Sequence, residues 1–463
     1  MGETVASSRW ISPNVLVLTV TLYALFLFAP RVLADGDTYW HIAAGDWMLA
    51  HGTVPRVDPF AFTTTGMIWV PHEWLAEIFF SVAYRLGGWA GVVLLTAAAA
   101  ALAGFLLARA LERFVAPQLA YAMLLLVVLT ILPTMLARPH ILALPVMVSW
   151  VVGLVRARAA GRVPPLWLAL VMLFWTNLHG GYMIGLAVAG ALAVEAMWED
   201  RAAWRGWALF LAATTLGACI TPLGLDGILF PFQMLRLGAT RNIQEWQPPN
   251  FQQLEPVEFV LMAMLALGLC GGVRLPWFRV ALFLGLAHSA LQVSRFQLQL
   301  SVIGFLLLAP GLGARFPMRP AGVGRAAGFA LAGLLALLTV ARVAVPIQRG
   351  DAAGTPVTAL ASVPEAVRGL PVLNAYRFGG FLIFHRVRPY VDSRADLYGD
   401  VFLNDYLAIQ DPRPDRVNAA MAKYEIAWTM LEPGSPLVAW LDKQPQWRRH
   451  YTDGFAVVHI RQP

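Results

Sequence analysis

The stretch LADGDTYWHIAAGDW, residues 33–47, follows directly after the first apolar segment of the chain. It places Asp35, Asp37 and His41 at the point where a membrane-spanning helix would leave the hydrocarbon layer. Ionisable groups at this depth cost free energy unless they pair or serve a site. The stretch therefore indicates a functional loop at one face of a membrane.

The composition supports a membrane protein. Of the 463 residues, 58% are hydrophobic and 13% are charged, whereas soluble domains carry about 25% charged residues. We expect a polytopic α-helical membrane protein, because only lipid can solvate this much apolar surface. Cys219 and Cys270 lie within apolar runs, which argues against a disulfide or a metal pair.

Apolar runs long enough for a hydrocarbon core of ~30 Å predict about eleven transmembrane helices. The first run also resembles a cleavable signal, but its length and the Pro30–Arg31 pair favour a retained helix. The stretch NLHGGY, residues 177–182, is either a turn between two helices or a kink in one. The predicted spans lie near 13–33, 89–109, 118–136, 141–156, 165–177, 181–197, 206–221, 257–272, 277–293, 297–313 and 326–346.

The net charge of +7 follows from arginines in short connections between the spans, so it does not indicate a nucleic-acid partner. The positive-inside rule places those connections and the N-terminus in the cytoplasm. Residues 1–349 then form the membrane module, with a first outer loop at about 34–88. Residues 350–463 form a small α/β domain on the outer face.

Five short runs in that domain are expected to be strands, and residues 413–424 are expected to be a helix. The predicted strands are LPVLNAY (370–376), GGFLIFH (379–385), PYVDSR (389–394), EIAWTML (425–431) and GFAVVHI (454–460). Asn374, Tyr376, Arg377, Asp392, Arg394, Asp396 and Tyr398 form a further polar group here. This group could contact an acceptor, seal a cleft or form a structural salt-bridge network.

Each outer connection between spans contributes polar residues close to the membrane boundary. We expect them to converge on one outward-facing cleft; the alternative is scattered loop polarity. They are Asp35, Asp37, His41, Asp58, His72 and Glu73 in the first outer loop, then Arg138, His140, Asn177, His179, Arg241, Glu245 and Arg295.

Two short helices are predicted in the first outer loop. Residues 38–50 form one, with Asp37 as its N-cap and on the same face as His41. Residues 72–86 form the other, with Glu73, Glu77, Ser81 and Arg85 on one polar stripe. Such a helix would lie in the membrane interface and could guide a lipid head group.

These features resemble the GT-C superfamily of polytopic glycosyltransferases, and more narrowly uncharacterised bacterial members of it. The likeness extends over nearly the whole chain. The stretches that carry it are DTYWHIAAGDWMLAHGTVPRVDPFAFTTTG (37–66), HEWLAE (72–77), NLHGG (177–181), EWQPP (245–249) and FGGFLIFHRVRPYVDSRADLYG (378–399).

The resemblance implies a bacterial inner-membrane enzyme that moves a sugar from a polyprenyl-phosphate donor to a glycan, lipid or protein acceptor. A first-loop carboxylate, Asp37 or Asp35, would serve as base. Arg138, Arg241 or Arg295, with His140 or His179, would neutralise the departing phosphate, and direct displacement would invert the anomeric centre. Some relatives bind a divalent cation through acidic residues. This chain has no convincing second acidic motif apart from Glu73 and Glu245, so no metal ligand is assigned, and a divalent cation is possible but not supported by the sequence.

Two other classes compete with this interpretation. An O-antigen ligase or polymerase also uses lipid-linked glycans, but relies on arginine and histidine without a first-loop carboxylate. A lipid or glycan transporter would place ionisable groups near mid-membrane. The predicted spans are nearly free of acids at that depth, and Glu195 lies near a cytoplasmic end.

Overall fold

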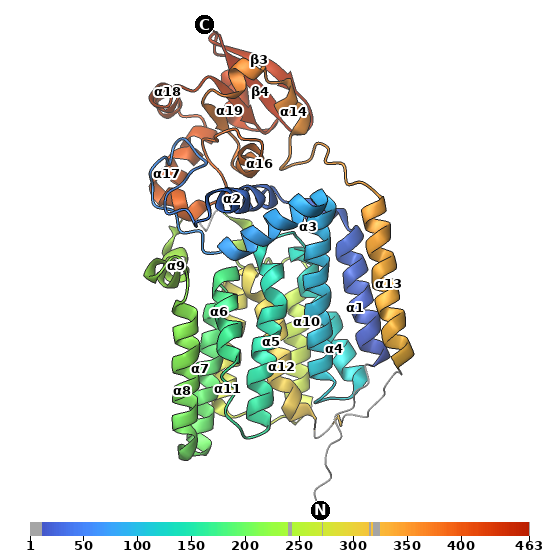
Figure 1. The fold of residues 1–463 in the computed structure, drawn as a ribbon. Helices are drawn as coiled ribbons and strands as arrows, with labels where there is room; N and C mark the ends of the chain where they lie inside the picture. The colour runs from blue at the N-terminus through green and yellow to red at the C-terminus, as the bar shows by residue number, and fades with distance from the viewer. Residues whose placement is uncertain (1–11, 239–242, 271, 314–315, 318–324, 463) are drawn as a thin grey trace, which may run out of the picture.

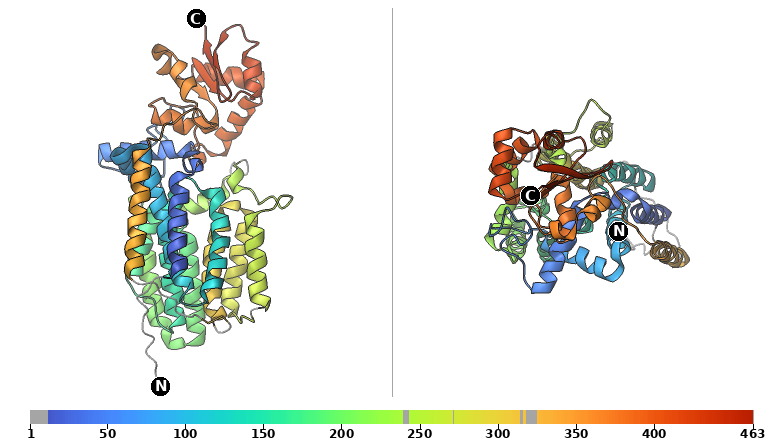
Figure 2. Two further views of the ribbon diagram at one scale, coloured as in Figure 1. Left: turned by 90° about the vertical axis from the view of Figure 1, so that its right-hand side faces the viewer. Right: turned by 90° about the horizontal axis from the view of Figure 1, so that it is seen from above.

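The computed structural model describes residues 12–238, 243–270, 272–313, 316–317 and 325–462. Long, roughly parallel helices form a bundle, two shorter helical segments lie across one end of it, and a mixed α/β layer covers that end (Figures 1 and 2). The bundle helices are α1 (Pro13–Phe28), α3 (Trp74–Leu111), α4 (Pro117–Ile131), α5 (Pro139–Ala159), α6 (Leu168–Leu178), α7 (Tyr182–Glu199), α8 (Trp204–Cys219), α10 (Pro256–Cys270), α11 (Trp277–Gln292), α12 (Gln297–Leu312) and α13 (Arg325–Ala344).

Helices occupy all the ranges in which spans are predicted. Within the described residues, six are both long and apolar enough to cross a membrane: Trp74–Leu111, Pro117–Thr134, Pro139–Ala159, Tyr182–Glu199, Ser294–Leu312 and Ala326–Ala344. Val15–Phe28, Leu168–Leu178 and Pro256–Cys270 are apolar but shorter. The exact number of spans therefore stays a prediction.

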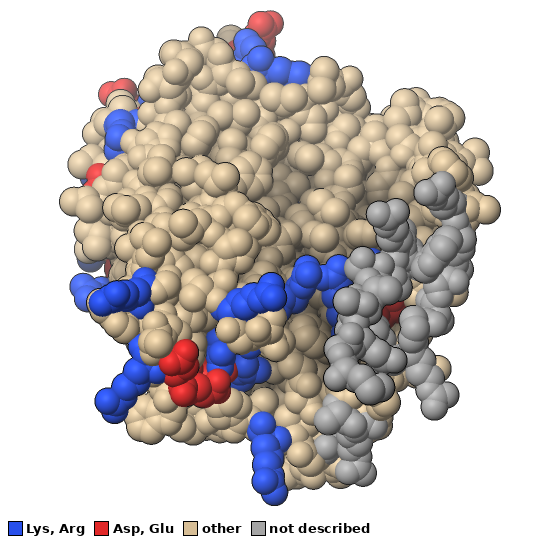
Figure 3. All heavy atoms as spheres, turned by 60° about the horizontal axis from the view of Figure 1, so that its bottom comes forward, with Lys and Arg blue, Asp and Glu red and all other residues tan. Residues whose placement is uncertain are grey.

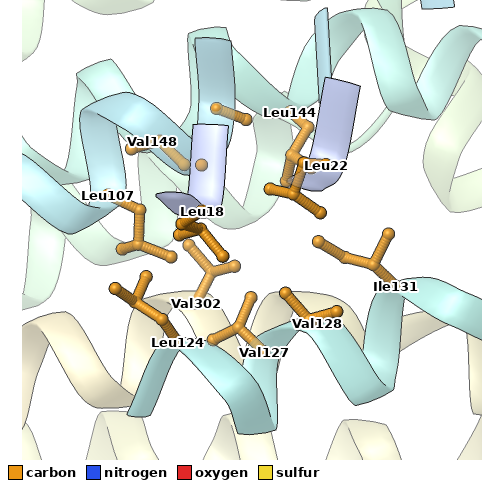
Figure 4. A pocket seen from close by; sticks show the side chains of 12 residues that line it. Leu18, Leu22, Leu107, Leu124, Val127, Val128, Ile131, Leu144, Val148 and Val302 are labelled. Carbon is orange, nitrogen blue, oxygen red and sulfur yellow. The ribbon is translucent and has the colours of Figure 1, made fainter. Parts of the chain in front are cut away.

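The interior of the bundle is aliphatic. Leu18 and Leu22 of α1 pack against α3, α4, α5 and α12 around a hollow that is lined by leucine, isoleucine, valine and small residues (Figure 4). No titratable side chain lines this hollow. It is therefore part of the apolar core and not a candidate reaction site.

Helix α2 (Asp37–His51) lies across the end of the bundle and packs on the first turns of α3 (Figure 1). The two helices approach closely at Gly45, where a Cβ atom would lie 2.1 Å from the carbonyl oxygen of Glu77. Helix α3 then bends at Gly87 and Gly88. Gly88 has a φ of +55°, which a residue with a side chain rarely adopts. At this bend α3 changes from a course across the end of the bundle to one along the bundle (Figure 1).

Two details of the first outer loop differ from the prediction. Asp37 is the first residue of α2 and not its cap; the Asp35 carboxylate accepts the Asp37 backbone N–H at 3.1 Å instead. The second difference is that part of the polar stripe on α3 contacts α2. Ser81 and Arg85 both donate to Asp46 of α2, each at 2.7 Å, so the stripe joins the two helices.

Two connections on the covered end of the bundle also take definite form. NLHGGY is a turn, because α6 ends at Leu178 and α7 begins at Tyr182. An additional helix, α9 (Leu225–Arg236), follows α8 and was not predicted. Its Phe230 stacks on His72 of the first outer loop, with ring centroids 3.9 Å apart.

The C-terminal layer contains a four-stranded sheet with strand order β1–β2–β4–β3. Strands β1 and β2 are parallel, and the other two pairs are antiparallel. The elements are α14 (Val357–Ser362), α15 (Glu365–Arg368), β1 (Val372–Asn374), α16 (Gly379–Phe384), α17 (Ala395–Gln410), α18 (Pro414–Lys423), β2 (Trp428–Leu431), α19 (Pro436–Leu441), β3 (Trp447–Thr452) and β4 (Val457–Arg461).

The strand predictions are right for β1, β2 and β4 and wrong elsewhere. GGFLIFH forms helix α16, whose buried side chains pack on α2. PYVDSR forms no strand and makes a single bridge at Pro389. The edge strand β3 was missed because its sequence, WRRHYT, is mostly polar and lacks the apolar pattern of a buried strand. In the fold, most of its side chains are exposed or half-buried.

The C-terminal layer shares a core with the first outer loop. Trp40 and Trp69 pack in one apolar cluster with Tyr390 and Tyr398. Beside them, the buried Arg394 guanidinium is 2.6 Å from both Asp58 and Asp392 and lies over the Trp69 ring. This ion pair holds two segments together that are more than 300 residues apart in the sequence.

Lysine and arginine side chains gather at the end of the bundle opposite the C-terminal layer (Figure 3). Arg109 lies in the last turn of α3, and Arg156 and Arg158 in the last turn of α5. The buried Glu195 pairs there with Arg158 at 2.8 Å and with Arg279 at 2.7 Å. The charge asymmetry expected from the positive-inside rule is thus a feature of the folded bundle.

Replacing Arg394 by alanine should loosen the C-terminal layer. Asp58 and Asp392 would be left buried without their cation, and breaking a buried pair in this way costs about 3–5 kcal/mol. We expect a lower unfolding midpoint in detergent and earlier proteolysis of the C-terminal segment. The control Arg416→Ala removes an exposed pair with Asp405 and should change both little. Equal effects of the two variants would contradict this role of Arg394.

Candidate functional site

The centre of the polar cluster is Arg138, which precedes α5. Its guanidinium contacts three carboxylates from separate parts of the chain. Nε lies against Asp35, Nη2 is 2.6 Å from Asp37, and Nη1 donates to Glu245 at 2.9 Å. Three segments that the sequence predicts to meet therefore meet at one side chain.

Asp37 is the first-loop carboxyl with the more unusual environment. Burial raises the pKa of Asp37 to about 6, against the opposing effect of Arg138, and the nearby Asp35 charge raises it further. The Ser393 hydroxyl donates to Asp37 and itself accepts the indole N–H of Trp40 at 3.0 Å. Asp37 is therefore mostly ionised at neutral pH, but its pKa lies only about one unit below that pH.

Glu245 links Arg138 to a second cation. Arg295 lies 3.2 Å from Glu245, and its guanidinium is 5.0 Å from the centre of the Trp246 ring. Although burial alone would raise it, the pKa of Glu245 is lowered to about 2 by Arg295 and Arg138. Arg295 is engaged by one carboxylate and Arg138 by three, so Arg295 has more hydrogen-bonding capacity for an anion. Arg241, also predicted to bind phosphate, lies outside the described residues.

A second group of residues borders the charged cluster. Glu73 lies 3.5 Å from Nε2 of His179 and 3.7 Å from Nε2 of His72. The His179 ring is 6.4 Å from that of His140, whose Nε2 is 3.0 Å from the Thr134 carbonyl oxygen. Burial raises the pKa of Glu73 to about 8 against the effects of Arg295 and Arg138, and lowers that of His72 to about 3.

Three predicted site residues have other surroundings. Asn177 accepts from the Trp74 indole at 2.8 Å and donates to the Ile220 carbonyl at 2.9 Å, so it joins helices. Asp58 holds the Arg394 pair described above. His41 does not pair with Asp37 but lies 3.6 Å from Glu77, and burial lowers the pKa of His41 well below its ordinary value.

Sequence reasoning did not include Ser393 and Tyr376 in the site. Both come from the C-terminal layer. Tyr376 is close enough to Asp37 and Asp396 for their charges to raise its pKa, which burial already places well above the usual range. Its hydroxyl has no hydrogen-bond partner among the described residues. The nearest sequence signal was the polar group at 374–398, to which no catalytic role was given.

The described residues contain no group of three or more histidine, cysteine or acidic side chains arranged to hold a metal ion. The carboxylates that come closest together, those of Asp35, Asp37 and Glu245, converge on Arg138. The use of a divalent cation by this site is not tested by the structure.

The arrangement of helical bundle, crossing helices and α/β layer is a fold that this chain shares with two solved structures. The oligosaccharyltransferase of Archaeoglobus fulgidus in its apo form matches with a TM-score of 0.52 and 11% identity, over 90% of this chain and 69% of that chain. ArnT from Cupriavidus metallidurans bound to undecaprenyl phosphate matches with a TM-score of 0.53 and 14% identity, over 96% and 97%. No protein-family model matches the sequence, and no curated protein is similar to it in sequence.

The geometry of Asn177 predicts a structural effect of its replacement. Asn177→Leu leaves the Trp74 N–H and the Ile220 carbonyl unpaired, a loss of about 1–3 kcal/mol of stability. The unfolding midpoint in detergent should fall, whereas Asn418→Leu, at an exposed position on α18, should leave it unchanged. The stabilisation gained on adding undecaprenyl phosphate should be the same in both variants. Selective loss of that gain in Asn177→Leu would instead assign Asn177 to phosphate binding.

Proposed function

We propose that this protein is a membrane glycosyltransferase that moves a sugar from a polyprenyl-phosphate donor to an acceptor hydroxyl. The observation that supports this most is the convergence of Asp37, Arg138, Glu245 and Arg295 from separate connections at one end of the bundle. It combines a carboxylate that can accept a proton with a cation that can bind a phosphate. The fold is shared with membrane enzymes, one of them in a complex with undecaprenyl phosphate.

In the proposed reaction Asp37 accepts the proton of the acceptor hydroxyl. The acceptor oxygen forms a bond to the anomeric carbon while the bond from that carbon to the phosphate oxygen breaks. The lipid phosphate leaves with the bonding electrons, and Arg295 neutralises its charge. Because the acceptor attacks opposite the leaving group, the configuration at the anomeric carbon inverts.

Arg138 is proposed as a positioning residue for this base. Without a cation, Asp35, Asp37 and Glu245 would repel one another, and burial would leave Asp37 protonated at neutral pH. Arg138 opposes both effects on Asp37. Both aspartates bind Arg138, but the Asp35 side chain is less exposed than that of Asp37, 12% against 20%, which makes Asp35 the weaker candidate for the base.

The site is proposed to lie on the outer face of a bacterial inner membrane. The arginine-rich end of the bundle would face the cytoplasm, so the polar cluster and the α/β layer would face outward. Residues 350–463 would act as an outer domain whose Ser393 and Tyr376 border the base. The acceptor would then be a glycan, lipid or protein on that side.

A ligase or polymerase acting on lipid-linked glycans is the alternative, since it would use the same arginines and histidines. The two differ in their need for the first-loop carboxylate. Replacing Asp37 therefore separates them.

Asp37→Asn should reduce transfer from polyprenyl-phosphate sugars by about 10²–10⁴-fold, the usual contribution of a general base. Binding of undecaprenyl phosphate should remain. Transfer is followed with radiolabelled donor in inner-membrane vesicles and purified protein. Asp415→Asn, at an exposed site on α18, is the control. Full transfer by Asp37→Asn would favour the ligase-like alternative.

The raised pKa of Asp37 predicts a pH dependence. Only the ionised carboxylate can accept the proton, so kcat/KM should be level above a pH of about 6 and fall about tenfold per unit below it. Arg138→Gln removes the charge that lowers this pKa, so the fall should begin at higher pH. An unchanged profile in Arg138→Gln would contradict the role given to Arg138.

A further inference from the structure

The polar cluster has two halves that differ in charge. Asp35, Asp37, Arg138, Glu245 and Arg295 are joined by short ionic contacts, whereas the contacts of Glu73 to His72 and His179 exceed hydrogen-bonding distance. The glycosyl transfer proposed above uses the first half for the phosphate and the base. It gives no role to Glu73 and its histidines.

The hydrogen bonding of His179 indicates an uncharged ring. Its Nδ1 accepts the Gly181 backbone N–H at 3.0 Å, which requires that Nδ1 carry no proton. The remaining ring proton is then on Nε2, which faces Glu73. Burial and the charge of Arg295 also lower the pKa of His179 well below its ordinary value.

Glu73 and His72 complete this uncharged surface. Among the described residues, the Glu73 carboxyl forms no hydrogen bond, and its side chain is 10% exposed. With its pKa raised to about 8, the carboxyl holds its proton at neutral pH and can both donate and accept. Phe230 fixes the His72 ring from the other side, and His72 also lines a narrow hollow with Thr176, Tyr182 and Thr221.

The hollow contains a further unused polar group. Tyr182 is buried, and its hydroxyl has no hydrogen-bond partner among the described residues. A buried polar group without a partner costs about 1–3 kcal/mol. As the side chains lie here, the hollow is too small for a water molecule, so the Tyr182 hydroxyl is not part of the proposed surface.

We infer that Glu73, His72 and His179 form an uncharged hydrogen-bonding surface that holds the hydroxyl groups of a neutral sugar on the donor lipid. This inference rests on the proposed function and narrows its substrate class to sugars without a carboxylate or an amino group. A uronic acid would bring a carboxylate against three uncharged side chains, where its charge would lose water without gaining an ion pair from any of them. An amino sugar would bring a cation into a surface already bordered by Arg295 and Arg138.

The test measures binding, so that it does not depend on turnover. Undecaprenyl phosphate is compared with the same lipid carrying a neutral hexose, a uronic acid or an amino sugar, using full-length protein in detergent. The neutral hexose should lower Kd by about tenfold relative to the bare lipid, as two neutral hydrogen bonds would. The charged sugars should give no such gain.

Three variants distinguish the role of Glu73. Glu73→Gln keeps an uncharged donor and acceptor and should retain the sugar-dependent gain, whereas Glu73→Ala should lose it. Glu365→Gln, an exposed acid on α15, is the matched control and should behave as the unaltered protein. Loss of the gain in Glu73→Gln, or an equal gain for a charged sugar, would overturn the inference.

The pH dependence gives a second measure. A bound sugar shields Glu73 further from water, so the gain should decline as the pH rises through about 8 in the unaltered protein and stay constant in Glu73→Gln. The titratable and charged groups around Glu73 are His72, His179, Glu77, Arg138, Glu245, Arg295 and Asp396.

The binding results also separate the two proposals. Failure of bare undecaprenyl phosphate to bind would overturn the proposed function, and the inference with it. Binding of the bare lipid without any gain from the neutral sugar would overturn the inference alone.

Discussion

The interaction on which the site depends is the contact of one guanidinium, that of Arg138, with three carboxylates. Asp35 comes from the end of the first connection, Asp37 from the start of α2, and Glu245 from the segment before α10. Each acid alone would be costly to bury at a membrane boundary, and the three together would repel one another. Their common cation fixes where these segments meet. Because Arg138 is fully engaged, the proposed reaction assigns phosphate binding to Arg295, whose guanidinium contacts Glu245 alone among the paired carboxylates.

Three carboxyls of the polar cluster have very different pKa values. The two arginines next to Glu245 hold its pKa near 2, burial with partial compensation raises that of Asp37 to about 6, and burial raises that of Glu73 to about 8. At neutral pH the cluster therefore contains a permanent anion, an ionised base near its titration range, and a neutral acid. Environments that separate the acidities of neighbouring groups in this way are typical of acid–base sites. These differences in pKa divide the polar cluster into an ionic half and an uncharged half.

The sequence predicts the bundle helices well, because runs of apolar residues long enough to cross a membrane admit few other structures. It also indicates that residues from separate connections meet, since the connections on one side of a bundle share one end, but not every residue named from the sequence takes part. It does not predict their partners. Asn177 was expected in the polar cleft and joins Trp74 to Ile220, and Asp37 was expected as the N-cap of α2 but is its first residue. GGFLIFH was expected as a strand, because short apolar runs do not distinguish strand from helix. Ser393 lies 356 positions after Asp37, so only the folded chain shows their contact.

The most direct measurement of the central claim is a cryo-electron microscopy structure of the protein in a lipid nanodisc with undecaprenyl phosphate. The account predicts density for the phosphate within hydrogen-bonding distance of the Arg295 guanidinium, on the same side of the bundle as Asp37 and with the contacts of Arg138 intact. A phosphate bound among the arginines at the opposite end of the bundle, with the cluster around Arg138 unoccupied, would contradict it.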